Sequence, residues 1–431
     1  MAPTPTYREA LRVFARIGCL SFGGPAGQIA LMHHELVERR GWIDEGEYLR
    51  ALNFCHLLPG PEAQQLAVWI GWRLHGLRGG LAAGLLFVIP GALVILALSL
   101  LYVGAAGLPW FAALFLGVKA AVLALVVQAL IRIGKRALDT PLKVALATCA
   151  FLSLVALDLP FPVVVLGAGA IGIGLAAIDP ALLALKPLGA LTSLPPRGPL
   201  VRGTLRTVAA WLVIWLAPLA LLAGLLGQGH VLVEIGAFFG KLAVVTFGGA
   251  YAVLAYMAQE AVGTHGWLTT AEMADGLGLA ETTPGPLIMV TQFVGFLGAW
   301  RSPAPFTPLV AGLLGAGITT WMTFAPCFLW IFAAAPWLDR LERNRSLQGG
   351  LAALTAAVVG VIASLAVWFA LHVLFTRVTR VAGIALPDLA SLDWRAAVLT
   401  VLAFALLFRT RLGVIGTLAV CGAAALGVGI V

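Results

Sequence analysis

The sequence predicts an all-α, polytopic membrane protein built from two inverted (antiparallel) repeats with broken or re-entrant helices and about ten membrane spans. Three observations lead to this prediction: an apolar composition, basic residues placed between apolar runs, and an internal repeat. Of the 431 residues, 61% are hydrophobic and 11% are charged. A soluble domain usually has about 45–50% apolar and 25% charged residues. A soluble enzyme, a nucleic-acid-binding module and a disordered protein are therefore excluded.

Long apolar runs mark the expected membrane spans. They cover residues 79–104, 109–131, 144–158, 160–180, 208–227, 307–335, 349–375, 394–408 and 412–431. The formal charge is +8, and the Lys and Arg residues form short clusters between these runs. This distribution is typical of the positive-inside rule and predicts a lipid bilayer as partner, with no nucleic acid. The five cysteines are widely spaced, which favours neither a disulfide framework nor a metal site.

An internal repeat divides the chain. Residues 22–61 align without a gap to residues 247–286, and Phe-Gly-Gly, Gly-Trp and Pro-Gly-Pro match in one register. We expect a first transporter repeat over residues 1–180 and a second, inverted one over residues 208–431. Between them, residues 181–207 are rich in proline, glycine and basic residues and are expected to form a cytoplasmic linker.

The charge clusters predict how each repeat enters the membrane. Clusters around residues 132–143, 186–206, 340–345 and 409–411 are expected to face the cytoplasm. Because residues 208–227 form one crossing, the second repeat starts on the side opposite to the first, and the repeats are inverted. Arg377 and Arg380 fall on the wrong side of this map. Inverted repeats are common in secondary transporters, whose substrate site lies near the midplane between them.

Two stretches in each repeat are poorly suited to an unbroken transmembrane helix. One contains a Gly-Gly pair, which favours a broken helix, although close helix packing through small residues is the alternative. Pro25 suits the first turn of a new helix after the first pair. The other stretch is Pro-Gly-Pro, whose second proline fits the first position of a following helix. A loop cap at the membrane surface is the alternative for this motif.

Helix starts at membrane depth would expose unpaired N–H groups, which bind anions. Uncapped backbone is tolerated there only where it lines a cavity or the protein interior. The four breaks therefore predict a polar chamber for an oxyanion. The candidate substrate-binding residues are Arg16, Gly23, Gly24, Pro59, Gly60, Pro61, Gln65, Lys241, Gly248, Gly249, Pro284, Gly285 and Pro286. Gln64 and Gln292 are further candidates for lining this chamber.

Fixed cations are also required, because helix ends alone cannot offset the desolvation of a dianion. Arg16 and Lys241 occupy equivalent positions six residues before each Phe-Gly-Gly. Basic residues inside a membrane are functional candidates, and snorkelling to the interface is the alternative. Lys119 lies in an apolar run. An ion pair between helices and a role in the substrate pathway are equally compatible with this position.

Titratable residues lie beside the Pro-Gly-Pro motifs and suggest proton coupling. Glu281 and His56 occupy equivalent places before the two motifs, and Glu62 follows the first. Histidine changes charge near neutral pH, and burial raises the pKa of a carboxyl group. Plain hydrogen bonds or salt bridges are the alternative for these residues. Glu35 and Glu260, at the ends of the helices after each Gly-Gly, are expected to form salt bridges.

The motif regions resemble the chromate ion transporter family in its long, two-domain form. The resemblance rests on FGGPAGQIALMHHELVERRGW and LLPGPEAQQLAVWIGW in the first half, and on TFGGAYAVLAYMAQE and ETTPGPLIMVTQFVGF in the second. It implies efflux of chromate across the bacterial inner membrane, chromate resistance, about ten spans and antiparallel halves. His56 departs from the family pattern, where glutamine is expected, and this weakens the case for coupling on that side.

Other functions stay open at this point. One is transport of sulfate or another small anion, and a homodimer is possible in either case. Another is a membrane-embedded enzyme such as a reductase, but the sequence has no haem, flavin or iron–sulfur pattern, so no cofactor is expected. It also lacks Walker A, HExxH and GxSxG motifs. We therefore expect a secondary transporter and not an enzyme.

Overall fold

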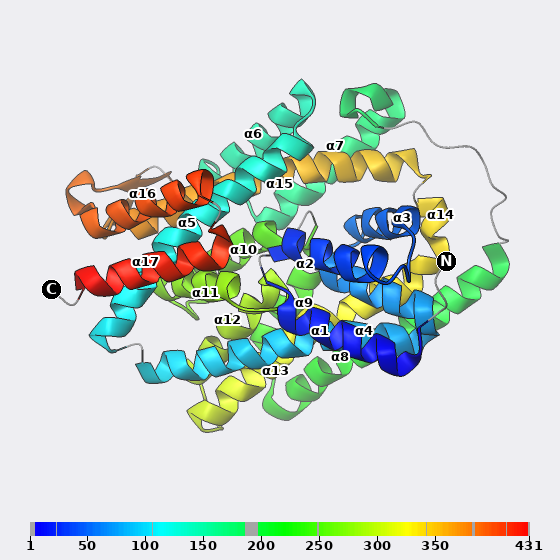
Figure 1. Cartoon of the computed structure of the whole chain (residues 1–431), viewed down its shortest axis with the longest axis horizontal. Coiled ribbons are helices and arrows are strands. Elements are labelled where there is room, and N and C mark those ends of the chain that lie inside the picture. Colours follow the sequence, from blue (N-terminus) through cyan, green and yellow to red (C-terminus); the bar gives the residue numbers. More distant parts are fainter. Residues whose placement is uncertain are drawn as a thin grey trace. The chain divides into compact units, whose positions relative to one another are not determined.

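The structure, a computed structural model, describes residues 5–22, 24–105, 107–185, 197–247, 250–341, 343–381, 384–410 and 412–429. Throughout these ranges the chain is almost entirely helical, which confirms the prediction of an all-α architecture (Figure 1). The helices α5, α6, α7 and α13 start with proline in the first turn, where its missing N–H leaves no hydrogen bond unmade.

The first half contains α1 (Tyr7–Leu20), α2 (Gly24–His33), the π-helical turn η1 (His34–Glu38), α3 (Glu45–His56), α4 (Glu62–Ala105), α5 (Pro109–Ala137), α6 (Pro141–Val155), α7 (Phe161–Ile178) and the 3₁₀ turn η2 (Pro180–Leu183). Then α8 (Arg197–Leu226) follows.

The second half contains α9 (Val231–Val245), α10 (Ala250–Ala258), η3 (Gln259–Thr264), α11 (Thr270–Thr282), η4 (Leu287–Met289), α12 (Val290–Arg301), α13 (Pro308–Ala334), η5 (Ala335–Trp337), α14 (Leu338–Leu341) and α15 (Arg345–Leu374). A short antiparallel hairpin of β1 (Val378–Val381) and β2 (Ile384–Pro387), then η6 (Leu389–Ser391), α16 (Trp394–Arg409) and α17 (Gly413–Gly429) complete it.

Six helices of the described residues are long and apolar enough to cross a membrane. They are Glu62–Ala105, Pro109–Ala137, Phe161–Ile178, Leu200–Leu226, Pro308–Leu341 and Arg345–Leu374. Three shorter apolar helices, Pro141–Val155, Leu287–Arg301 and Gly413–Gly427, have 10–17 residues. The chain is thus a multi-pass membrane protein, as the composition predicts, and the number of ten spans stays a prediction.

The structure differs from the sequence-based expectation at three places. The apolar run 79–104 continues a helix that starts at Glu62, and α4 is interrupted at His75 and Gly76, where glycine adopts φ 61°. Part of the expected linker is helical, since α8 begins at Arg197; residues 186–196 lie outside the described residues. The β1–β2 hairpin was not expected, because its short strands leave too weak a pattern of alternation to be recognised.

The chain forms two compact units. Unit 1 contains residues 1–99, 188–250 and 283–344, and unit 2 contains residues 100–187, 251–282 and 345–431. These units cut across the two repeats: α2 and α3 belong to unit 1, whereas their counterparts after the second Gly-Gly, α10 beyond its first residue and α11, belong to unit 2. The repeat boundaries remain a prediction from the sequence.

In unit 1, α13 packs against α8, α9 and α12. Gly312 and Gly315 allow α13 to approach Phe296 and Ala299 of α12 closely. This is the small-residue packing expected between membrane helices. A second part of the core joins α1, α3, α4 and α13 through buried side chains that include Ile17, Phe54, Val68 and Phe328.

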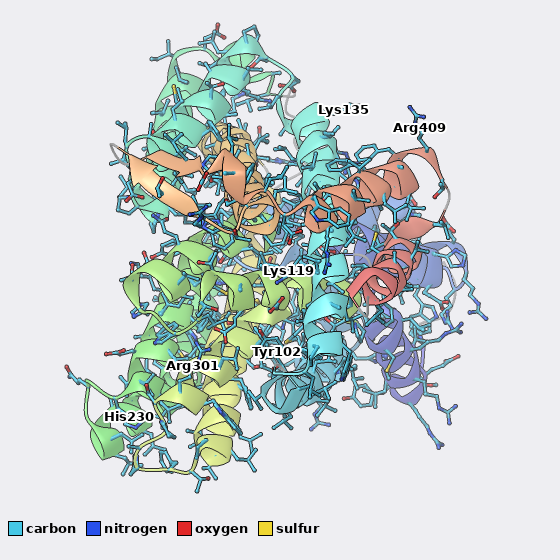
Figure 2. All side chains as sticks on the ribbon, turned by 90° about the vertical axis from the view of Figure 1, so that its left-hand side faces the viewer. Tyr102, Lys119, Lys135, His230, Arg301 and Arg409 are labelled. Atoms are coloured by element: carbon cyan, nitrogen blue, oxygen red, sulfur yellow. The ribbon has the colours of Figure 1, made fainter. Side chains whose placement is uncertain are left out.

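In unit 2, α15 packs against α5, α6 and α7, and α16 and α17 pack against α5 (Figure 1). Gly349 of α15 meets Ala176 and the backbone of Gly172 on α7, so this contact too depends on small residues. Lys135 of α5 and Arg409 of α16 lie toward the same end of unit 2, whereas Lys119 lies midway along α5 (Figure 2).

Candidate functional site

Both Gly-Gly stretches interrupt a helix. In the first, α1 ends at Leu20 and α2 begins at Gly24, which has φ 70°. In the second, α9 ends at Val245 and α10 begins at Ala250. The prediction of broken helices is confirmed, and Pro25 does lie in the first turn of α2. The candidates Gly23, Gly248 and Gly249 themselves lie outside the described residues.

Both Pro-Gly-Pro motifs form turns between helices. Gly60 has φ 118° and Gly285 has φ 91°, a region that glycine occupies far more readily than other residues. After Pro61, α4 begins directly at Glu62, whereas Pro286 precedes the 3₁₀ turn η4 and then α12. The second proline of each motif therefore stands before the first helical residue, and the expected placement at the first helical position was wrong by one residue. A fixed φ near −65° suits that preceding position as well.

Two reciprocal hydrogen bonds join these breaks within unit 1. The N–H of Gly60 donates to the carbonyl of Thr246 at 2.8 Å, and the N–H of Gly285 donates to the carbonyl of Ser21 at 2.8 Å. Thr246 follows α9 and Ser21 follows α1, and the two residues occupy equivalent positions in the repeats. Each Pro-Gly-Pro turn thus caps the helix end before the Gly-Gly break of the other repeat.

The hydroxyls of the same two residues turn back onto their own helices. Ser21 Oγ donates to the carbonyl of Ile17 at 2.6 Å, and Thr246 Oγ1 donates to that of Leu242 at 2.5 Å. Both side chains are buried. Because a helix leaves its last carbonyls without intrahelical partners, these contacts satisfy backbone groups that water would otherwise have to reach. The local chemistry of the two helix ends is therefore the same in both repeats.

Buried amide side chains hold the turns. Gln65 Nε2 donates to the carbonyl of Pro59 at 2.6 Å, and Gln28 Nε2 donates to the carbonyl of Gly285. Gln292 Nε2 donates to the carbonyl of Ala92 at 2.9 Å, while its Oε1 accepts from Thr320 Oγ1 at 3.0 Å. Gln65, a predicted site residue, and Gln292 are therefore part of the break architecture.

Neither glycine has room for a side chain. A Cβ on Gly60 would lie 2.9 Å from Gln65 Nε2 and 3.1 Å from Cys327 Sγ of α13. A Cβ on Gly285 would lie 3.1 Å from the Cα of Gly91 on α4. The first turn thus meets side chains, and the second meets backbone, so overpacking is harder to relieve at Gly285.

Several fully buried polar atoms near the two turns lack a hydrogen-bond partner. In the described part of the chain they include both amide atoms of Gln64, Oε1 of Gln65 and Oε1 of Gln28. Gln64 and Gln65 are 0% exposed, and Gln28 is 1% exposed. Buried polar groups are nearly always paired with protein, water or a ligand. These amides therefore have the capacity to bind a polar ligand, and Gln64 Nε2 offers a donor beside the first turn.

The titratable candidates differ in their surroundings. Glu62 is buried in the first turn of α4, and Glu281 is buried at the end of α11, where its Oε1 accepts a hydrogen bond from Tyr251 at 2.9 Å. His56, the counterpart of Glu281 in the first repeat, is exposed. The matched pair that the sequence suggested is therefore unequal in burial.

The structure places Arg16 and Lys241 on exposed faces of α1 and α9, outside the group of buried residues around the turns. In α1 the buried face consists of Ala10, Val13, Phe14, Ile17 and Gly18. The helical period of 3.6 residues places Arg16 on the opposite face of α1. Their role as fixed countercharges stays a prediction.

Glu35 forms the expected salt bridges at the end of the helix after the first Gly-Gly. Its carboxylate lies 3.1 Å from Arg39 Nη1 and also contacts Arg40. Burial opposes ionisation, but the hydrogen bonds and charges of Arg40 and Arg39 outweigh it and lower the pKa of Glu35. These two ion pairs lie at η1, which is outside the candidate membrane spans.

Sequence reasoning missed Asp275, Tyr102 and Gln28. Asp275 is 8% exposed, accepts a hydrogen bond from Tyr102 at 2.7 Å and pairs with Lys119 at 3.1 Å. The available signal was one acidic residue within the apolar sequence MADGLGLA. Gln28 carried no such signal, because an amide one turn after a glycine break is indistinguishable from any polar helix residue.

Comparisons with known proteins match most of the chain. The family model described as Chromate transporter matches residues 8–173 and 233–428. A protein named chromate transport protein from Pseudomonas aeruginosa is 34% identical over 84% of this chain and 80% of its own length. Another of that name from Cupriavidus metallidurans is 30% identical over 84% of this chain and 82% of its own. A probable chromate transport protein from Synechococcus elongatus is 28% identical over 84% of each chain. No solved structure matches.

Proposed function

The chain belongs to the chromate transporter family, and from that premise we propose that it is a secondary transporter that exports chromate across the bacterial inner membrane and so confers resistance. The observation that carries this proposal is the pair of reciprocal hydrogen bonds in unit 1, which links all four helix breaks. Around it lie buried amides with unpaired atoms in a protein otherwise rich in apolar residues. Such a site favours binding and release of a polar solute.

The repeats are proposed to be inverted about this pair. A reciprocal pair of contacts between equivalent residues is what a two-fold axis between the two segments produces. The single helix α8 between the repeats would start the second repeat on the opposite side of the membrane. The common direction of Lys135 and Arg409 in unit 2 agrees with the placement of both basic clusters at the cytoplasm (Figure 2).

The binding chemistry follows from the donors at the first turn. The first N–H groups of α4 have no intrahelical acceptor, and Gln64 Nε2 has no partner within the described structure. A tetrahedral oxyanion accepts several hydrogen bonds and is favoured by the positive end of a helix. The carboxylate of Glu62 works against such binding, so we propose that this side chain turns away when the anion is bound.

Arg16 and Lys241 are proposed to supply the positive charge that a dianion needs. Helix ends contribute about 0.3–1 kcal/mol each, up to about 2 when partly buried, which is small against the cost of burying a charge. Because both cations lie on exposed faces of α1 and α9, the proposed role is attraction of the anion toward the helices that end at the breaks.

The direction of transport follows from the membrane potential. With a negative interior, moving one negative charge outward yields about 2.3 kcal/mol per 100 mV. A dianion thus gains roughly 4.6 kcal/mol, enough for a gradient of about a thousand-fold or more. Export requires no further energy source, whereas concentrative uptake would need a coupled ion.

Chromate flux in proteoliposomes with an imposed membrane potential tests the proposal. We expect a potential that is negative on the side of the chromate to drive it across, and sulfate at equal concentration to compete weakly. Transport of sulfate with little chromate flux would assign the protein to sulfate instead. The absence of any potential-driven anion flux would reject the proposed function.

A further inference from the structure

Three side chains that the transport proposal does not use meet in unit 2. Lys119 Nζ of α5 lies 3.1 Å from Asp275 Oδ1 of α11, and the hydroxyl of Tyr102 at the end of α4 donates to Asp275 Oδ2 at 2.7 Å. The side chains of Lys119 and Asp275 are only 20% and 11% exposed. Tyr102 and Lys119 are labelled in Figure 2.

The other charges around Asp275 are few. The helix α11 packs against α5, α15 and α17. The sequence of α17 contains no acidic, basic or histidine residue, and that of α15 contains only Arg345 and His372, near its two ends. On α11 itself, Glu272 lies one turn before Asp275, and Glu281 lies at the C-terminal end with Tyr251 as its partner. On α5, Lys119 is the cation in contact with Asp275, whereas Arg132 acts on Glu281, and Lys135 and Arg136 lie in the last turn of α5.

The charge state of Asp275 depends on the position of α11 relative to α5, because its ion-pair partner Lys119 lies on α5. A buried ion is tolerated only with a partner, and separating the two leaves each charge without compensation. If α11 moves away from α5, Asp275 becomes neutral by taking up one proton from water, while Lys119, whose side chain is 20% exposed, keeps its charge. When α11 returns to α5, Lys119 again stabilises the carboxylate, and the proton is released. Proton occupancy therefore follows the separation of α11 and α5.

We propose that Asp275, paired with Lys119 and held by Tyr102, is the proton-binding site that links anion flux to the pH gradient. This inference rests on the proposed transport function. The helix α11 ends at Thr282, two residues before the Pro-Gly-Pro turn whose Gly285 bonds to Ser21. The backbone therefore runs directly from α11 into that turn.

Glu281, which the sequence suggested for coupling, differs in one respect. It is buried on the same helix and bonded to a tyrosine, as Asp275 is, but its hydrogen-bond partner is the neutral hydroxyl of Tyr251, and the cation Arg132 of α5 acts on it only at longer range, without a salt bridge among the described residues. A neutral partner changes the proton affinity of a carboxyl group less than a cation does. Glu281→Gln is accordingly the matched control for Asp275→Asn.

The first test measures chromate flux in proteoliposomes at fixed membrane potential, with and without a pH gradient. In the wild type, a gradient of one unit is expected to change chromate accumulation about tenfold per coupled proton. Asp275→Asn should retain potential-driven flux and lose this response, and Glu281→Gln should keep it. A normal response in Asp275→Asn, or its loss only in Glu281→Gln, would overturn the inference. A wild type that transports chromate without any pH response would also overturn it, while the proposed function would stand.

A second test does not depend on chromate. Infrared difference spectra of the purified protein during a pH titration report the C=O stretch of each protonated carboxyl group. We expect one titrating band to be absent in Asp275→Asn and to persist to higher pH in Lys119→Gln. The exchanged variant Lys119→Asp/Asp275→Lys, which keeps the pair, controls for folding. An unchanged set of bands in Asp275→Asn would reject the site even if the protein transports no chromate.

Discussion

The two Pro-Gly-Pro turns have the same backbone and different side chains. Both place glycine at positive φ, and both donate the glycine N–H to the helix end of the other repeat. Around the first turn, α4 begins with Glu62, Gln64 and Gln65, whereas the equivalent positions of the second are Leu287, Met289 and Val290. The shared backbone therefore serves the architecture of both repeats, whereas the four residues after the second proline include polar side chains only at the first turn.

The largest expected effect is a difference in stability between variants of the two turn glycines, Gly60 and Gly285. Gly285→Ala should destabilise the protein more than Gly60→Ala, because the new Cβ meets the backbone of Gly91 in the first case and side chains in the second. The positive φ costs about 1–2 kcal/mol in either variant, and overpacking adds about 1–3 kcal/mol. Thermal unfolding of the purified variants measures the difference. Gly174→Ala, in open space on α7, is the control. Equal losses at both glycines would contradict the packing difference.

The next effect concerns the cations on α1 and α9. Arg16→Gln or Lys241→Gln is expected to abolish anion flux while insertion and folding stay normal, since the cation that attracts the dianion toward the breaks is lost. Flux in proteoliposomes and the yield of folded protein measure the two effects. Arg12→Gln, exposed on the same helix as Arg16, is the matched control. Wild-type flux in both variants would assign Arg16 and Lys241 to snorkelling.

A smaller effect is expected from Glu62, the negative charge at the polar turn. Glu62→Gln should tighten anion binding, because a like charge about 4 Å away costs roughly 1–4 kcal/mol depending on the local dielectric. The corresponding affinity gain is about fivefold or more, measured by equilibrium binding of labelled chromate. Leu287→Gln, at the equivalent apolar position, should bring no such gain. A loss of affinity in Glu62→Gln would indicate that its carboxylate holds the site together.

The smallest effect concerns Glu35, whose carboxylate pairs with Arg39 and Arg40. Glu35→Gln is expected to lower stability at pH 7 by about 1 kcal/mol. Because the pKa of Glu35 is lowered from 4.5 in the folded state, its stabilising contribution is present above pH 4.5 and is lost as the pH falls through the folded value. Melting curves of wild type and variant should therefore differ at pH 7 and converge at strongly acidic pH. A difference that persists in acid would exclude the ion pairs as its source.

The breaks were predictable from sequence because their signals are local. Glycine pairs and Pro-Gly-Pro disfavour helix by backbone chemistry alone, and the repetition of both motifs showed that neither is accidental. Helix positions followed from apolar runs in the same way, as at Pro308–Ala334 for an expected run of 307–335. These features depend on neighbours within a few residues.

The contacts across the chain were not predictable. The bond from Gly60 to Thr246 and the pair of Lys119 with Asp275 join residues far apart in sequence, and no local pattern specifies such partners. The sequence also treated His56 and Glu281 as equivalent, because a fixed offset cannot show that one is exposed and the other buried. Burial is decided by packing of distant helices, which a repeat in one chain does not fix.

The central claim is that two inverted repeats meet at reciprocal helix breaks, and cysteine labelling of equivalent positions tests it most directly. Gly46 and Ala271 are small, exposed and equivalent, near the starts of α3 and α11. Each is replaced by cysteine in a background where the exposed Cys19 and Cys149 are serine. With an impermeant thiol reagent applied to sealed vesicles of known orientation, one cysteine should react from outside and the other only from inside. Labelling of both from the same side would contradict the account.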